Sequence, residues 1–128
     1  MVTFSQAIKS FYSNYANFKG RASLSQYWWV ALYYSFVAVC VLYIPAMLCS
    51  NGGQEGFGFW FFMILMYLFA LINLIPSIAL TVRRLHDTNR GGGWYFISLI
   101  PLIGGIWMLV LMLQPSIRGE NRFGAQPE

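Results

Sequence analysis

RRLHDTNRGGGW, residues 83–94, separates two long apolar runs of the chain. Five of its first eight residues are titratable, although only 9% of all residues are charged and 58% are hydrophobic. Soluble domains carry about a quarter charged residues. A water-soluble protein of 128 residues with this composition would have more apolar surface than it could cover. The composition therefore predicts an integral membrane protein with one domain.

Three uncharged runs follow one another, at 27–49, 57–82 and 94–113, with 23, 26 and 20 residues. A helix needs roughly 20 apolar residues to cross a hydrocarbon core of about 30 Å, so each run is long enough to span. The first run is too long and too far from the N-terminus for a cleaved signal peptide. We expect a single all-α membrane domain over residues 1–128, with three transmembrane helices and a tail at 114–128.

The third run allows two interpretations because Pro101 and Gly104-Gly105 lie at its centre. A straight span would carry the tail to the outside, whereas a re-entrant hairpin would return it to the cytoplasmic side. Turn-like backbone at that depth must be shielded by protein, while proline and glycine are tolerated in spans. We therefore predict a straight span, and the hairpin stays open as the alternative.

An amphipathic helix is expected before the first span, over residues 3–19. Its apolar stripe recurs at helical spacing and consists of Phe4, Ile8, Phe11, Tyr15 and Phe18. Thr3 or Ser5 can cap its start, and Gly20 can end it. We expect this helix to lie in the membrane interface, and the alternative is that its stripe packs on the other helices.

The distribution of basic residues predicts the orientation in the membrane. Six bases flank the first run or separate the second from the third: Lys9, Lys19, Arg21, Arg83, Arg84 and Arg90. Residues 50–56 contain no base, so the N-terminus and residues 83–90 are expected in the cytoplasm. The aromatic residues expected at headgroup level are Tyr27, Trp28, Trp29 and Trp94.

Residues 83–94 can be explained without any catalytic role. Arg83 and Asp87 lie four apart on one helical face and are expected to pair, while Arg84 and His86 point elsewhere. Asn89 and the glycines tolerate positive φ, so the chain can turn there. The residues predicted to bind anionic lipid are Arg21, Arg83, Arg84 and Arg90.

A catalytic role is weakly indicated for His86 and Asp87 alone. Adjacent helical residues point about 100° apart, so these two do not form an acid–base dyad by themselves. The sequence has no GxSxG, HExxH, phosphate loop or metal-spaced Cys/His pattern. We expect no metal, no cofactor and, on balance, no enzymatic activity.

Four motifs occur in order: GR at 20–21, YWW at 27–29, RRLHDTNR at 83–90, and GENRFG with a later proline at 119–127. In this the chain resembles the domain of unknown function 805 family of small bacterial inner-membrane proteins. The resemblance implies an inner-membrane location and marks Asn121 and Arg122 as motif residues. Leu24 and Gln26 replace an arginine and an acid of the family pattern, and Asn89 replaces a common glycine.

The leading functional prediction is a non-enzymatic inner-membrane protein whose basic cytoplasmic face binds anionic phospholipids or an acidic partner. One alternative is an oligomeric transporter or channel, for which Asn73 is the strong polar candidate inside a span. Another is a lipid-modifying enzyme that uses His86 and Asp87. We expect no nucleic-acid partner, and the sequence leaves homo-oligomerisation open.

Overall fold

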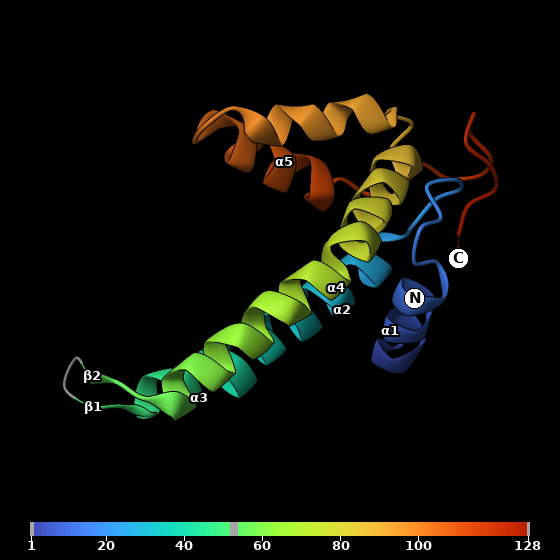
Figure 1. The fold of residues 1–128 in the computed structure, drawn as a ribbon. Helices are drawn as coiled ribbons and strands as arrows, with labels where there is room; N and C mark the ends of the chain where they lie inside the picture. The colour runs from blue at the N-terminus through green and yellow to red at the C-terminus, as the bar shows by residue number, and fades with distance from the viewer. Residues whose placement is uncertain (1, 52–53, 128) are drawn as a thin grey trace. The chain divides into compact units, whose positions relative to one another are not determined.

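The computed structural model describes residues 2–51 and 54–127, which form two compact units. One unit contains Met1–Val30 with Pro76–Glu128, and the other contains Ala31–Ile75. The elements are α1 (Phe4–Ser13), α2 (Leu24–Phe36), the π-helical η1 (Val37–Tyr43), α3 (Ile44–Leu48), β1 (Ser50–Asn51), β2 (Gln54–Glu55), α4 (Phe57–Asp87), the 3-10 helix η2 (Gly92–Leu99) and α5 (Ile103–Leu113) (Figure 1).

Two helices are long and apolar enough to cross a membrane. The first joins α2, η1 and α3 into 25 residues, Leu24–Leu48, and the second is α4 with 31 residues. They match the runs predicted at 27–49 and 57–82, but α4 continues past its run to Asp87. The RRLHD residues therefore form the last turn of this helix.

Asn89 ends α4 as predicted. It has a φ of 61°, a conformation that asparagine tolerates better than most residues. The Arg90 N–H then donates to the Leu85 carbonyl at 2.9 Å, which closes the helix end.

In the unit of residues 31–75, aromatic contacts join α2 to α4. The Phe69 ring lies 6.4 Å from the Tyr33 ring and 5.1 Å from the Tyr34 ring, measured between centroids. Buried Asn73 donates its amide to the Phe69 carbonyl at 2.8 Å, within its own helix. Many large apolar side chains of this unit are exposed, such as Tyr67 at 64%, whereas Leu42 and Phe59 are buried.

Helix α1 is shorter than the predicted 3–19. Thr3 begins it through a reciprocal capping box with Gln6, as expected for a threonine cap. The helix ends at Ser13 because Asn14 turns its amide back onto the Ser10 carbonyl at 2.9 Å, and Asn17 donates to Asn14 at 2.9 Å. Such local side-chain bonds compete with helix continuation.

The apolar stripe of α1 is divided between the protein interior and the surface. Phe11 is 1% exposed and belongs to a core with Ala7, Ala22, Val30 and Leu80. The other large members, Phe4, Tyr15 and Phe18, are 43%, 42% and 40% exposed. The alternative interpretation, in which the stripe packs on other helices, is therefore correct for Phe11 at the centre of the stripe.

The run predicted as one straight span at 94–113 folds instead into two helices. Helix η2 ends at Leu99, and α5 begins at Ile103 after a turn in which Leu102 has a φ of 63°. Pro101 lacks the N–H of a continuous helix and its ring clashes with the preceding turn, which favours a break. Figure 1 shows the orange η2 segment alongside α5. The structure therefore adopts a helical hairpin over this run, as in the alternative interpretation.

Gly104 permits the close contact between these two helices. A Cβ at this position would lie 1.9 Å from the Ile97 carbonyl oxygen, whereas a Cβ at Gly105 would have nothing within 4 Å. We expect Gly104→Ala to lower the free energy of unfolding by about 1–3 kcal/mol, as overpacking does. Thermal unfolding in detergent measures this. Gly105→Ala is the matched control and should be neutral or slightly stabilising, so equal losses in both variants would contradict the packing.

Candidate functional site

The Asp87 carboxylate is the centre of the polar cluster in the unit that contains both ends of the chain. Its side chain is 0% exposed. Oδ1 accepts a hydrogen bond from Arg21 Nε at 2.9 Å, and Oδ2 accepts one from Arg84 Nη1 at 2.6 Å. Ser116 Oγ also donates to Oδ2. Each carboxylate oxygen thus has a charged partner, which offsets the cost of burying it.

The two guanidinium groups also bind the C-terminal tail. Arg21 Nη1 donates to the Gly119 carbonyl at 2.6 Å and to the Gly124 carbonyl at 3.2 Å, and Nη2 donates to the Ile117 carbonyl. Arg84 Nη2 donates to the Gln114 carbonyl. Figure 1 shows this red tail returning to the blue segment between α1 and α2. The N-terminal segment, the end of α4 and the tail therefore meet at Asp87.

His86 joins the same three segments through its ring and backbone. Its Nδ1 lies 2.9 Å from the Gly20 carbonyl oxygen and must be the donor, because a carbonyl only accepts. The ring stacks on Phe123 with centroids 4.0 Å apart and planes 3° apart. Asn121 donates its amide to the His86 carbonyl at 2.9 Å. The NRFG motif thus packs directly on the RRLHD motif.

Arg122, the second motif residue of the tail, lies over the Phe123 ring at 4.7 Å. Its Nη2 donates to the Asn89 carbonyl at 3.3 Å. The motif itself is a tight turn, because Asn121 and Gly124 exchange two backbone hydrogen bonds of 3.0 Å. Arg122 therefore connects this turn to the chain that follows α4.

The predicted pair between Arg83 and Asp87 is wrong. Asp87 pairs with Arg84, three residues earlier, and with Arg21, which the sequence separates from it by 66 positions. Arg83 is only 4% exposed, yet its Nε and Nη2 have no hydrogen-bond partner among the described residues. The backbone carbonyl of Arg83 accepts from the Ala22 N–H at 3.0 Å.

The four arginines predicted to bind lipid therefore differ in their environments. Arg21 and Arg84 are committed to Asp87 and to the tail, so we assign them a structural role. Arg90 is half-buried and lies 5.9 Å from the centroid of the Trp94 ring. Among the described residues, Arg83 has two buried donors without a partner, Nε and Nη2, and Arg84 has one, Nε.

Three of the four residues predicted as interfacial anchors make hydrogen bonds or core contacts within the protein. Trp28 donates its indole N–H to the Met112 carbonyl at 3.2 Å, and Trp29 donates to the Val2 carbonyl at 3.1 Å. Tyr27 packs against the cores around Phe11 and around Leu85. Trp94 is 44% exposed.

This arrangement holds three chain segments together. Both oxygens of Asp87 and the Nδ1 proton of His86 are already engaged. Among residues 2–51 and 54–127, no group of three or more His, Cys, Asp or Glu is placed to hold a metal ion. The roles of Arg21 and Ser116 were not predicted, since both act across long stretches of sequence. The GR motif was the only signal for Arg21.

Replacing the buried carboxylate tests whether the cluster stabilises the fold. In Asp87→Asn, the two guanidinium groups stay buried without a counter-charge. We expect the free energy of unfolding to fall by about 3–5 kcal/mol, measured by thermal or denaturant unfolding in detergent. Glu120→Gln removes an exposed acid from the same tail and is the matched control. Similar unfolding curves for both variants would show that the cluster is not the stabilising element.

Known proteins with similar sequences extend over nearly the whole chain. Inner membrane protein YhaI of Escherichia coli K12 is 34% identical over 115 residues, which cover 90% of this chain and 89% of the relative. Inner membrane protein YhaH of the same strain is 34% identical over 116 residues, or 90% of each chain. Uncharacterized protein YiiR of the same strain is 31% identical in an alignment that covers 84% of this chain and 84% of the relative. No solved structure matches the chain.

The family of proteins of unknown function named DUF805 matches residues 15–125. This range includes the GR motif, both long helices and the tail up to Ala125. All the residues that meet at Asp87 therefore lie inside the matched region, and the chain belongs to the DUF805 family.

Proposed function

We propose that the chain is a non-enzymatic, multi-pass protein of the bacterial inner membrane that binds anionic lipid headgroups on its cytoplasmic side. Two relatives carry the name inner membrane protein, and two helices here are long and apolar enough to span. The base-free segment 50–56 then lies outside, with the N-terminus in the cytoplasm.

The observation that carries this proposal is the position of the charges. All eight lysines and arginines belong to the unit of residues 1–30 and 76–128. The Asp87 cluster holds the N-terminal segment, the end of α4 and the tail together there. Four of the bases are exposed, namely Lys9, Lys19, Arg118 and Arg122. Each base near an anionic leaflet contributes about 1 kcal/mol to its attraction.

The engagement of His86 and Asp87 supports a non-enzymatic role over the lipid-modifying alternative. An acid–base pair needs a free proton acceptor or donor within reach of substrate, and both oxygens of the Asp87 carboxylate are held by Arg21 and Arg84, so Asp87 is not free to act as the partner of His86. Asn73 bonds within its own helix, which lends no support to an ion path.

We further propose that residues 92–113 re-enter the membrane and do not cross it. The tail that follows α5 bonds to Arg21 and Asp87, which belong to the segment before the first span and the end of the second. All three segments must therefore lie on one side of any membrane that the two long helices cross.

Cysteine labelling in intact cells tests this topology. In a background with Cys40 and Cys49, both free thiols, replaced by alanine, we expect Ala125→Cys to resist a membrane-impermeant maleimide. Labelling should appear once the inner membrane is permeabilised. Gly56→Cys, in the segment proposed to lie outside, is the control and should react in intact cells. Reaction of Ala125→Cys in intact cells would contradict re-entry.

Neutralising the exposed bases tests the lipid preference. The wild-type protein should bind phosphatidylglycerol more tightly than phosphatidylcholine, as counted by native mass spectrometry of detergent-solubilised protein. With Lys9→Gln, Lys19→Gln and Arg118→Gln combined, that preference should fall by about tenfold or more, since each base contributes about 1 kcal/mol. Exchanging lysine and arginine at the same positions keeps the charge and is the matched control. An unchanged preference in the neutralised variant would refute the proposal.

A further inference from the structure

The charges buried around α4 do not balance. Within the described residues, the buried ionised side chains are Arg21, Arg83 and Arg84 against Asp87. Asp87 is shared by Arg21 and Arg84, so no buried carboxylate of residues 2–51 and 54–127 is left for Arg83. The other described acid of this unit, Glu120, is exposed. A buried cation without a counter-charge is strongly unfavourable, and such groups are normally paired.

The free atoms of Arg83 form a recognition edge. Nε and Nη2 both lack a hydrogen-bond partner among the described residues. In a guanidinium group, the N–H bonds of these two atoms point the same way and match two oxygens of one oxyanion. The residue keeps 4% of its surface exposed, but Nε and Nη2 themselves are shielded from solvent.

We propose that Arg83 is the specific binding residue for a phosphate oxyanion. Its Nε and Nη2 donate hydrogen bonds to two of the phosphate oxygens. Phosphate suits the position because Arg83 directly follows the uncharged run 57–82, where a spanning helix reaches headgroup level. The same chemistry is offered by a phospholipid phosphodiester and by free inorganic phosphate.

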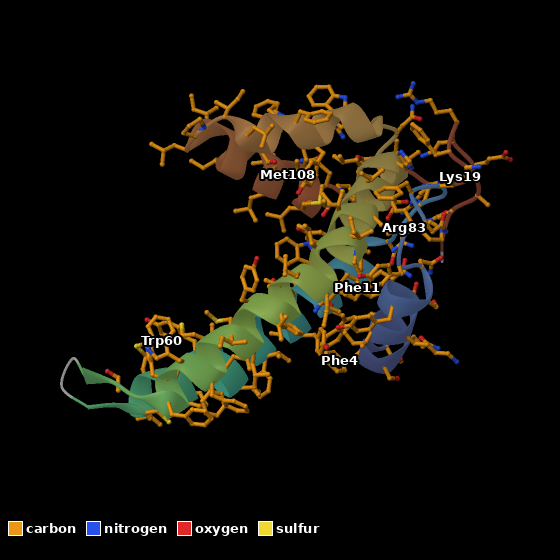
Figure 2. All side chains as sticks on the ribbon, in the orientation of Figure 1. Phe4, Phe11, Lys19, Trp60, Arg83 and Met108 are labelled. Atoms are coloured by element: carbon orange, nitrogen blue, oxygen red, sulfur yellow. The ribbon has the colours of Figure 1, made fainter. Side chains whose placement is uncertain are left out.

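The surroundings of Arg83 favour an anion over a cation or a neutral ligand. The backbone carbonyl of Arg83 accepts a hydrogen bond from the Ala22 N–H, which anchors the residue to the segment between α1 and α2. Figure 2 shows Arg83 at the end of α4 that approaches the loop carrying Lys19. Arg84 Nε is a further buried donor without a partner. This inference deepens the proposed function, because it assigns one defined site within a generally basic region.

Thermal unfolding of the full-length protein in a neutral detergent tests the site. Without added anion, Arg83→Met should raise the Tm above that of wild type, because methionine keeps much of the apolar stem and removes an unpaired buried charge. Dihexanoyl-phosphatidylglycerol should raise the Tm of wild type but not of Arg83→Met. Arg90→Met makes the same chemical change elsewhere in the 83–94 stretch and should keep the response to this lipid.

Two further probes identify the source of the phosphate. Dihexanoylglycerol lacks the phosphate and should leave the wild-type Tm unchanged. A response to phosphatidylglycerol without a response to inorganic phosphate identifies the lipid headgroup, whereas a response to both identifies any phosphate oxyanion.

Arg83→Lys keeps the charge and removes the parallel pair of donors, so it tests the site even if the methionine variant does not fold. We expect its dissociation constant for the phosphate probe to rise about tenfold. The proposal is overturned if lysine binds as tightly as arginine, if Arg83→Met responds like wild type, or if neither phosphate probe shifts wild type.

The two proposals fail in different ways. A wild-type preference for phosphatidylglycerol that survives in Arg83→Met would remove the Arg83 site and leave the surface-charge proposal standing. A Tm response to phosphate that depends on Arg83, in a protein that binds phosphatidylglycerol and phosphatidylcholine equally, would refute the surface-charge proposal and leave the Arg83 site standing.

Discussion

One buried carboxylate, that of Asp87, determines how the charged half of this protein is arranged. Alone it would be costly in a shielded site, and so would the guanidinium groups of Arg21 and Arg84. Together they neutralise part of each other's charge, and Nη1 and Nη2 of Arg21 and Nη2 of Arg84 donate to backbone carbonyls of a tail that has no regular secondary structure. The tail is therefore positioned by two arginine side chains, which in turn depend on a single acid.

This dependence constrains the apolar run that precedes the tail. Residues 114–124 can reach Arg21 and Asp87 only if the chain turns back after leaving α4. The break at Pro101 and Leu102 and the close approach at Gly104 provide that turn. The hairpin and the polar cluster are thus two parts of one arrangement, since a straight helix over 94–113 would carry the tail about 30 Å away from its partners.

Local features were predictable from the sequence, whereas pairing between distant segments was not. The long apolar runs, the Thr3 cap and the turn at Asn89 each depend on neighbouring residues and were found. The choice of Arg84 over Arg83 as the partner of Asp87 depends on which face of α4 meets Arg21, and no spacing rule reports that. The length of α1 was overestimated because the apolar spacing continues to Phe18 while the bonds of Asn14 and Asn17 end the helix.

Gln26 stands where the resemblance to the family implies an acid, and its side chain is hydrogen-bonded to neighbouring residues. An acid at this position could accept hydrogen bonds but not donate one. The side-chain oxygen of Gln26 accepts from the Ser23 N–H at 3.1 Å, and the backbone N–H of Gln26 donates to Ser23 Oγ at 3.2 Å, so the two residues cap the start of α2 reciprocally. Its amide then donates to Ser10 Oγ at 2.9 Å and ties α1 to α2. Arg83 has no buried counter-ion among the described residues, which is the condition that an external phosphate needs.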